Sequence, residues 1–178
     1  MEEKWNILKS EYVYKCKWIT LRKDEVKMPS GYVIPDFYVL EYPHWVNVIA
    51  ITSDGKILLE KQYRHGLQEY CYELPAGVVD VGEEPLIAAQ RELQEETGYT
   101  GGRWSVFMKT APNASAMNNY CYTFLADGVE PTGETALEVS EDIDTLLVTK
   151  EELVQLLENG GIIEADMVAA VWKYLALH

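Results

Sequence analysis

The chain has 178 residues, of which 48% are hydrophobic and 25% are charged, a composition typical of a soluble globular protein. This length accommodates one domain with a sizeable core, or one domain with a small appendage. The formal net charge of −14 argues against a protein that binds nucleic-acid phosphates, because such proteins normally present basic surfaces. An acidic chain would also repel anionic substrates unless metal ions or local arginines reverse the field at the site.

The cysteines and the apolar segments indicate the cellular compartment of the protein. Cys16, Cys71 and Cys121 are odd in number and lack the spacing of a zinc site, so we expect free thiols in a reducing cytoplasm. The first ten residues contain no apolar segment, which argues against a signal peptide. No stretch approaches the apolar length that spans a bilayer, so we expect no membrane partner.

The first half of the chain is rich in strand signals. Residues 11–40 alternate between apolar and polar side chains around a turn at 29–31, which predicts a hairpin-like small sheet. A second strand-rich run begins at Trp45, and its two apolar segments flank Asp54-Gly55, a strong hairpin signal. Residues 70–74 form a further short strand that leads into a turn.

Helices and strands share the second half. Pro85 suits the first position of a helix and Gly98 its C-terminal stop, so we predict a helix between them. Thr149 followed by Glu152 resembles a capping box that opens another helix. The remaining patterns predict strands at 120–129 and 143–148 and helices at 149–158 and 165–177. This order of elements indicates an α+β fold, or a layered α/β/α arrangement.

Three glutamates share one face of the helix that begins at Pro85. Glu92, Glu95 and Glu96 stand three and four residues apart, so their carboxylates are expected to converge. Like charges at this spacing destabilise a bare helix, and a hard divalent cation held by carboxylate oxygens would offset the repulsion. Because no His or Cys lies nearby, such a cluster selects Mg²⁺ or Mn²⁺ over zinc. The alternative is a solvated acidic helix face, the commoner fate of a charge run.

The pattern from Gly77 to Tyr99 reads G-x5-E-x7-R-E-U-x-E-E-x-G-U, where U is a bulky apolar residue, and it resembles the Nudix box at every fixed position. The resemblance implies a mixed β-sheet between helices, with a small N-terminal antiparallel sheet. It also implies metal ligation by one carbonyl and by the box carboxylates, with Glu95 either a ligand or a general base. The expected metal-binding residues are therefore Ala76, Glu92, Glu95 and Glu96.

Two further residues join the expected catalytic group. Arg91 lies beside the ligand face and can pair with Glu83 or Glu95, which favours an architectural role over substrate contact. The family resemblance implies a glutamate on a later loop as catalytic base or extra ligand, and Glu141 is the best match. Glu95 and Glu138 remain alternatives for the base, because this loop departs from the usual pattern.

The segments QYR, residues 62–64, and ELPAG, residues 73–77, resemble the ADP-ribose pyrophosphatase branch, which includes other nucleoside diphosphate sugar hydrolases. This resemblance implies Mg²⁺-dependent cleavage of ADP-ribose, or a related nucleotide sugar, to AMP and a sugar phosphate. Arg64 would hold a phosphate or ribose, unless it forms a surface salt bridge, and Glu73 would hold a sugar hydroxyl or base edge. Trp18 and Trp45 would stack on an adenine ring, unless they belong to the core.

The same resemblance divides the chain into an N-terminal region, residues 1–42, and a Nudix catalytic domain, residues 43–178. Members of this branch commonly dimerise through the N-terminal region, so a homodimer with a pocket built from both subunits is expected. Two rival functions stay open. One is a Nudix pyrophosphatase for another nucleotide, such as a GDP-sugar, a dinucleotide or a nucleoside triphosphate. The other is a non-catalytic ligand sensor with the same fold.

Overall fold

The computed structural model describes residues 3–133 and 135–178, and the chain divides into two units. The first unit comprises Met1–Pro43 and Ala111–Asn119, and the second comprises His44–Thr110 and Tyr120–His178. The segment at 111–119 joins the first unit because Leu40 pairs with it. The Leu40 N–H donates to the carbonyl of Ala116 at 2.7 Å. The sequence alone does not indicate this grouping, since the segment lies far from the N-terminus along the chain.

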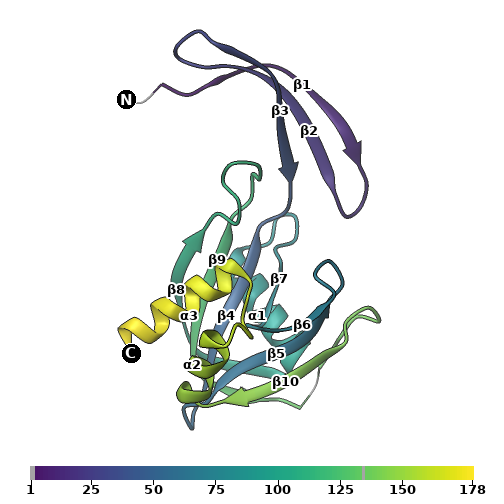
Figure 1. Ribbon diagram of the computed structural model, residues 1–178. Helices are drawn as coiled ribbons and strands as arrows, with labels where there is room; N and C mark the ends of the chain where they lie inside the picture. The colour runs from purple at the N-terminus through teal and green to yellow at the C-terminus, as the bar shows by residue number, and fades with distance from the viewer. Residues whose placement is uncertain (1–2, 134) are drawn as a thin grey trace. The chain divides into compact units, whose positions relative to one another are not determined.

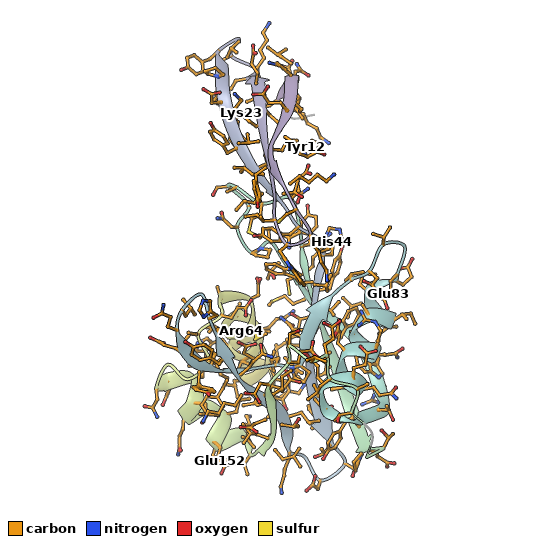
Figure 2. All side chains as sticks on the ribbon, turned by 90° about the vertical axis from the view of Figure 1, so that its right-hand side faces the viewer. Tyr12, Lys23, His44, Arg64, Glu83 and Glu152 are labelled. Carbon is orange, nitrogen blue, oxygen red and sulfur yellow. The ribbon has the colours of Figure 1, made fainter. Side chains whose placement is uncertain are left out.

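A three-stranded antiparallel sheet forms most of the first unit (Figure 1). Its strands lie in the order β1 (Asn6–Lys15), β2 (Thr20–Lys27) and β3 (Val33–Glu41). The predicted small antiparallel sheet is confirmed. It begins earlier than expected, at Asn6, and the segment before the turn at 29–31 forms two strands, β1 and β2. The break lies where the Cys16 N–H donates to the carbonyl of Ile19 at 2.9 Å. Side chains such as Tyr12 and Lys23 project from this sheet (Figure 2).

A seven-stranded mixed sheet is the centre of the second unit. Five strands lie in the order β10-β5-β4-β9-β8, while β6 pairs with β5 and β7 pairs with β4. Strands β4 and β9 run parallel, and the other pairs are antiparallel. The strand bounds are β4 (Trp45–Thr52), β5 (Ile57–Arg64), β6 (Glu69–Glu73), β7 (Ala76–Val78), β8 (Tyr99–Thr110), β9 (Cys121–Pro131) and β10 (Ile143–Val148).

Three helices cover the two faces of this sheet (Figure 1). On one face, α1 (Pro85–Thr97) buries Ala88, Ala89 and Leu93 against apolar side chains of β4, β5 and β9. On the other face, α2 (Lys150–Glu158) and α3 (Ala165–Leu177) pack in a separate apolar cluster with β4 and β5. Both faces of β4 and β5 are thus buried, which explains their nearly continuous apolar sequences. The predicted α/β/α sandwich is confirmed.

The turn and helix-cap residues predicted from the sequence have these roles in the structure. Gly55 turns the β4–β5 hairpin with φ of 81°, and Gly98 ends α1 in the left-handed conformation with φ of 71°. Thr149 and Glu152 form the reciprocal capping box of α2. In the described ranges, no helix combines the length and hydropathy required to cross a membrane.

Candidate active site on the box helix

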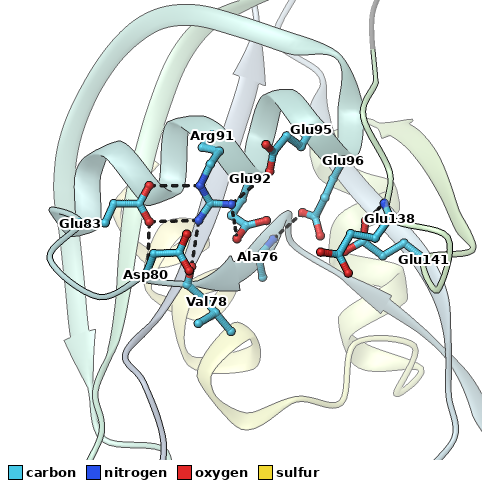
Figure 3. Close-up of polar contacts among 10 residues, drawn as sticks. All are labelled: Ala76, Val78, Asp80, Glu83, Arg91, Glu92, Glu95, Glu96, Glu138 and Glu141. Carbon is cyan, nitrogen blue, oxygen red and sulfur yellow. Dashed lines mark hydrogen bonds and ion pairs between the residues drawn. The ribbon is translucent and has the colours of Figure 1, made fainter. Parts of the chain in front are cut away.

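Arg91 of α1 organises the acidic side chains around it (Figure 3). Its Nε and Nη2 donate to the two carboxylate oxygens of Glu83, each at 3.1 Å. Its Nη1 donates to Glu92 at 2.8 Å and to Glu95 at 3.1 Å, and its Nη2 also reaches the carbonyl of Val78 at 3.0 Å. Hydrogen bonds from Arg91 lower the pKa of Glu83. The guanidinium therefore fixes the loop before α1 to the helix, the arrangement that the sequence suggested for it.

Gly77 lies in β7 directly against the Glu92 carboxylate. A Cβ atom at this position would lie 2.1 Å from both Cδ and Oε1 of Glu92. The sequence reasoning assigned Gly77 to a tight turn, and the structure corrects this, because the residue lies within a strand and its neighbour Ala76 pairs with Asn47 of β4. Glycine is required here because the carboxylate occupies the space that a side chain would fill.

Glu96 and Glu60 form a buried acidic pair behind the box. The Ala76 N–H donates to Glu96 Oε2 at 3.0 Å, which joins β7 to α1. Glu60 of β5 is 3% exposed and Glu96 is 6% exposed, and the two groups interact electrostatically. Burial raises the pKa of both groups, and the charge of Glu60 raises the pKa of Glu96 further.

The loop before β10 brings a further carboxylate toward the box helix. The Ala136 N–H donates to the carbonyl of Glu95 at 2.8 Å, which attaches this loop to α1. The Glu138 N–H donates to Glu141 Oε2 at 2.7 Å (Figure 3). Burial raises the pKa of Glu92, and the negative charge of Glu141 contributes to that rise, so the two carboxylates are electrostatically coupled. The assignment of Glu141 as base remains a prediction.

The box carboxylates are not a preformed metal cage. No group of three His, Cys, Asp or Glu residues with metal-binding geometry occurs within residues 3–133 and 135–178. The carboxylates of Glu92 and Glu95 converge on the Nη1 group of Arg91. The residues nevertheless fit a hard divalent cation, because all the donors are oxygens and Gly77 leaves room for the carboxylate of Glu92.

A cavity of about 690 Å³ opens beside β7. Its wall includes Ala76 and Gly77 of the box and the predicted substrate residues Arg64, Glu73 and Trp45. Its volume lies in the range of small-molecule sites, which run from roughly 300 to 1,000 Å³. Further wall residues that the sequence did not single out are Val46, Asn47, His65, Gly66, Leu67, Cys71, Val78, Cys121, Ile163, Glu164 and Met167.

Arg64 and Glu73 are partners of each other at this cavity. Arg64 Nε donates to Glu73 Oε1 at 2.7 Å, and Nη2 donates to Oε2, so the pair is bidentate. The Glu73 side chain is 4% exposed while that of Arg64 is 44% exposed, so the guanidinium is the more accessible partner. The sequence analysis left a salt bridge open as the alternative for Arg64, and such an ion pair is present; that its partner is Glu73 was not predicted.

The two tryptophans occupy different units. Trp45 begins β4 and lines the cavity. Trp18 belongs to the first unit, where it is 75% exposed and its ring centroid lies 4.2 Å from the Nζ atom of Lys17. Stacking of either ring on a base remains a prediction.

Glu60 was not identified from the sequence as a site residue, although a signal was present. It is a charged residue in the apolar run Ile57–Glu60, whose members are all buried. Charged residues are rarely buried completely without a partner or function. Asn47 carries a similar signal: it is 1% exposed in an apolar strand, and its Oδ1 atom has no hydrogen-bond partner in the described part of the chain.

Comparison with known proteins agrees with this geometry. Residues 43–171 match the family model of the NUDIX domain, and residues 5–40 match the nucleoside diphosphate sugar hydrolase N-terminal domain. The chain is 32% identical to the ADP-ribose pyrophosphatase of Bacillus subtilis (strain 168), covering 99% of this chain and 94% of that protein. It is also 32% identical to the methanol dehydrogenase activator of Bacillus methanolicus, covering 96% and 91%.

The fold is that of a known crystal structure as well. An ADP compounds hydrolase superposes with a TM-score of 0.85 at 22% sequence identity, covering 98% of this chain and 94% of that one. The NUDIX family model spans most of the chain, and its match contains the whole box from Gly77 to Tyr99. The protein belongs to the Nudix family.

Proposed function

We propose that this protein is a Mg²⁺-dependent pyrophosphohydrolase that cleaves ADP-ribose or a related nucleoside diphosphate sugar. The observation that carries the proposal is that β7 joins the box to the cavity: Ala76 and Gly77 line the cavity, and the Ala76 N–H donates to Glu96 of the box. The B. subtilis relative named ADP-ribose pyrophosphatase, similar over its whole length, favours this substrate among the nucleotides. The net charge of −14 gives a cation a clear role, because a diphosphate substrate would otherwise be repelled.

We assign the cation to carboxylates of α1 and to the backbone beside them. Glu92, Glu96 and the carbonyl of Ala76 would hold it, and Glu95 would supply a further oxygen. A bound Mg²⁺ neutralises phosphate charge and lowers the pKa of a water molecule. Arg91 acts as a positioning residue, because its hydrogen bonds set where the carboxylates of Glu92 and Glu95 lie.

The remaining residues bind and orient the substrate. Arg64 offers its accessible guanidinium to a phosphate, and Glu73, which already fixes that guanidinium, takes a hydroxyl or base edge. Trp45 at the cavity wall offers an aromatic surface to the base. Water adds to one phosphorus as its P–O bond to the bridging oxygen breaks, and Glu141 accepts the proton from the water. The products are AMP and a sugar phosphate.

A substrate panel tests this function directly. Product release is measured from ADP-ribose, GDP-mannose, UDP-glucose, NADH, a diadenosine polyphosphate and dGTP, each with Mg²⁺ and with EDTA. We expect cleavage of ADP-ribose above the others and none in EDTA. Preference for another nucleotide would be consistent with the box chemistry but would contradict the substrate-binding roles of Arg64 and Glu73. Tight binding of ADP-ribose without turnover would identify a sensor instead.

Glu96→Gln provides the matched variant for the panel. Because Glu96 is one of the proposed direct ligands, its neutral analogue should lose at least about a thousandfold in kcat while its circular dichroism spectrum is unchanged. Glu130→Gln is the control, since Glu130 is an exposed residue of β9. A Glu96→Gln protein with a near-normal rate would remove this residue from the metal site.

We also propose that the protein works in the cytoplasm as a homodimer. All three cysteines are free, and the two that line the cavity, Cys71 and Cys121, are buried. A reducing compartment keeps such thiols intact. The dimer is argued from the N-terminal sheet in the Discussion.

A further inference from the structure

Glu60 occupies a core position of β5 and points to the same sheet face as the box helix. Leu58 packs in the apolar cluster that contains α1, whereas Ile57 and Leu59 pack in the cluster on the opposite face. Side chains alternate along a strand, so Glu60 shares the face of Leu58. Its carboxyl group accordingly lies on the side of the sheet that α1 covers, and its charge acts on Glu96 of that helix. Glu60, which lies outside the box in the sequence, therefore faces the box helix from the sheet.

The surroundings of Glu60 leave part of its carboxyl group without a hydrogen-bond partner. Its Oε1 atom is buried and accepts no hydrogen bond from any group in the described part of the chain. Its direct cross-strand partner in β6 is another buried glutamate, Glu73, whose own carboxylate is bonded to Arg64. Like charges placed opposite each other destabilise a sheet, and an unpartnered buried carboxylate is costly. An apolar residue would serve the core better, so the carboxylate must serve something else.

We propose that Glu60 is an additional carboxylate of the cation site, contributed by β5 opposite Glu96 of the box helix. The proposal rests on the cation-dependent function described above and deepens it. With Glu60 included, the carboxylate donors come from two elements, α1 and β5, rather than from the helix alone. Carboxylates placed on a helix and on a central strand are held more rigidly than carboxylates placed on a mobile loop.

Direct titration of Mn²⁺ into the full chain without substrate tests this proposal. The dissociation constant is measured by isothermal titration calorimetry and by electron paramagnetic resonance of the free ion. The proteins are the wild type, Glu60→Gln, Glu60→Val and the control Glu130→Gln. We expect both Glu60 variants to bind Mn²⁺ at least about tenfold more weakly, and the control to bind as the wild type does.

Melting temperatures in EDTA separate binding from folding. Glu60→Val removes an unpartnered buried carboxylate, so its metal-free melting temperature should equal or exceed that of the wild type. Mn²⁺ should raise the melting temperature of the wild type and have less effect on either variant. A Glu60→Gln protein that binds Mn²⁺ within twofold of the wild type would overturn the proposal and leave the hydrolase function standing. Variants that unfold in EDTA would also overturn it, because Glu60 would then be structural. A wild type that binds no Mn²⁺ would reject the cation site itself.

Discussion

At the residue scale, the position of the Glu92 carboxylate depends on the missing side chain of Gly77. The carboxylate lies where a Cβ atom would be, and Arg91 holds it from the other side at 2.8 Å. Burial raises the pKa of Glu92, and the charge and hydrogen bond of Arg91 oppose that rise. Backbone and guanidinium together therefore set the geometry of one proposed ligand.

Gly77→Ala should displace this ligand without unfolding the protein. The atoms that the new methyl group would strike belong to the end of the Glu92 side chain, which can rotate away. We expect a loss of about 10²-fold in kcat for the preferred substrate, the scale of effect reported when reacting groups shift by about 1 Å. The melting temperature in EDTA should stay within a few degrees of the wild type. The control is Gly82→Ala: nothing lies within 4 Å of a Cβ there, although its φ of 83° adds backbone strain. If Gly77→Ala kept full activity, the observed position of Glu92 would be irrelevant to catalysis.

At the element scale, α2 carries the clearest local stability signal. The Thr149 hydroxyl accepts a hydrogen bond from the Glu152 N–H at 3.2 Å, and the Glu152 carboxylate accepts one from the Thr149 N–H at 2.8 Å. Thr149→Ala should lower the free energy of unfolding by about 1 kcal/mol, the usual effect of losing an N-cap. Gln155→Ala, on the exposed surface of the same helix, should change it by less than about 0.5 kcal/mol. Urea denaturation measures the free energy of unfolding of both variants. Equal changes in the two variants would show that the cap contributes nothing to stability.

The elements that the sequence could predict are those that depend on local interactions, as the cap of α2 does. The bounds of α1, the turn at Gly55 and the cap at Thr149 depend on residues within four positions of each other, and all were predicted. The three-residue strand β7 and the parallel pairing of β4 with β9 depend on segments far apart in the chain, and no local pattern encodes them. Within the site, the box residues were identifiable from their spacing, whereas Glu60 becomes informative only once β5 lies beside α1.

At the scale of the whole molecule, the first unit leaves its apolar side chains uncovered. Every residue of β1 is exposed, and the only buried apolar residue among those described in this unit is Val26. Its large exposed apolar residues are Trp5, Ile7, Leu8, Tyr12, Val13, Tyr14, Trp18, Ile19, Tyr32, Val33 and Tyr38. A sheet normally packs against a second layer, and exposed apolar surface on this scale marks an interaction site. A second copy of the chain is the partner that we propose for this surface.

Charge introduced into this sheet should therefore dissociate the dimer. Leu8 and Tyr12 are 52% and 57% exposed, so glutamate at both positions fits the isolated unit but would be costly in an apolar interface. Sedimentation equilibrium should give the mass of a dimer for the wild type and of a monomer for the Leu8→Glu, Tyr12→Glu protein. The control carries the same added charge on exposed residues of the second unit, Ser105→Glu and Gln155→Glu, and should remain dimeric. A wild type that sediments as a monomer up to high micromolar concentration would contradict the dimer. If the charged variant became monomeric and also lost substrate affinity while still binding Mn²⁺, both subunits would contribute to the substrate pocket.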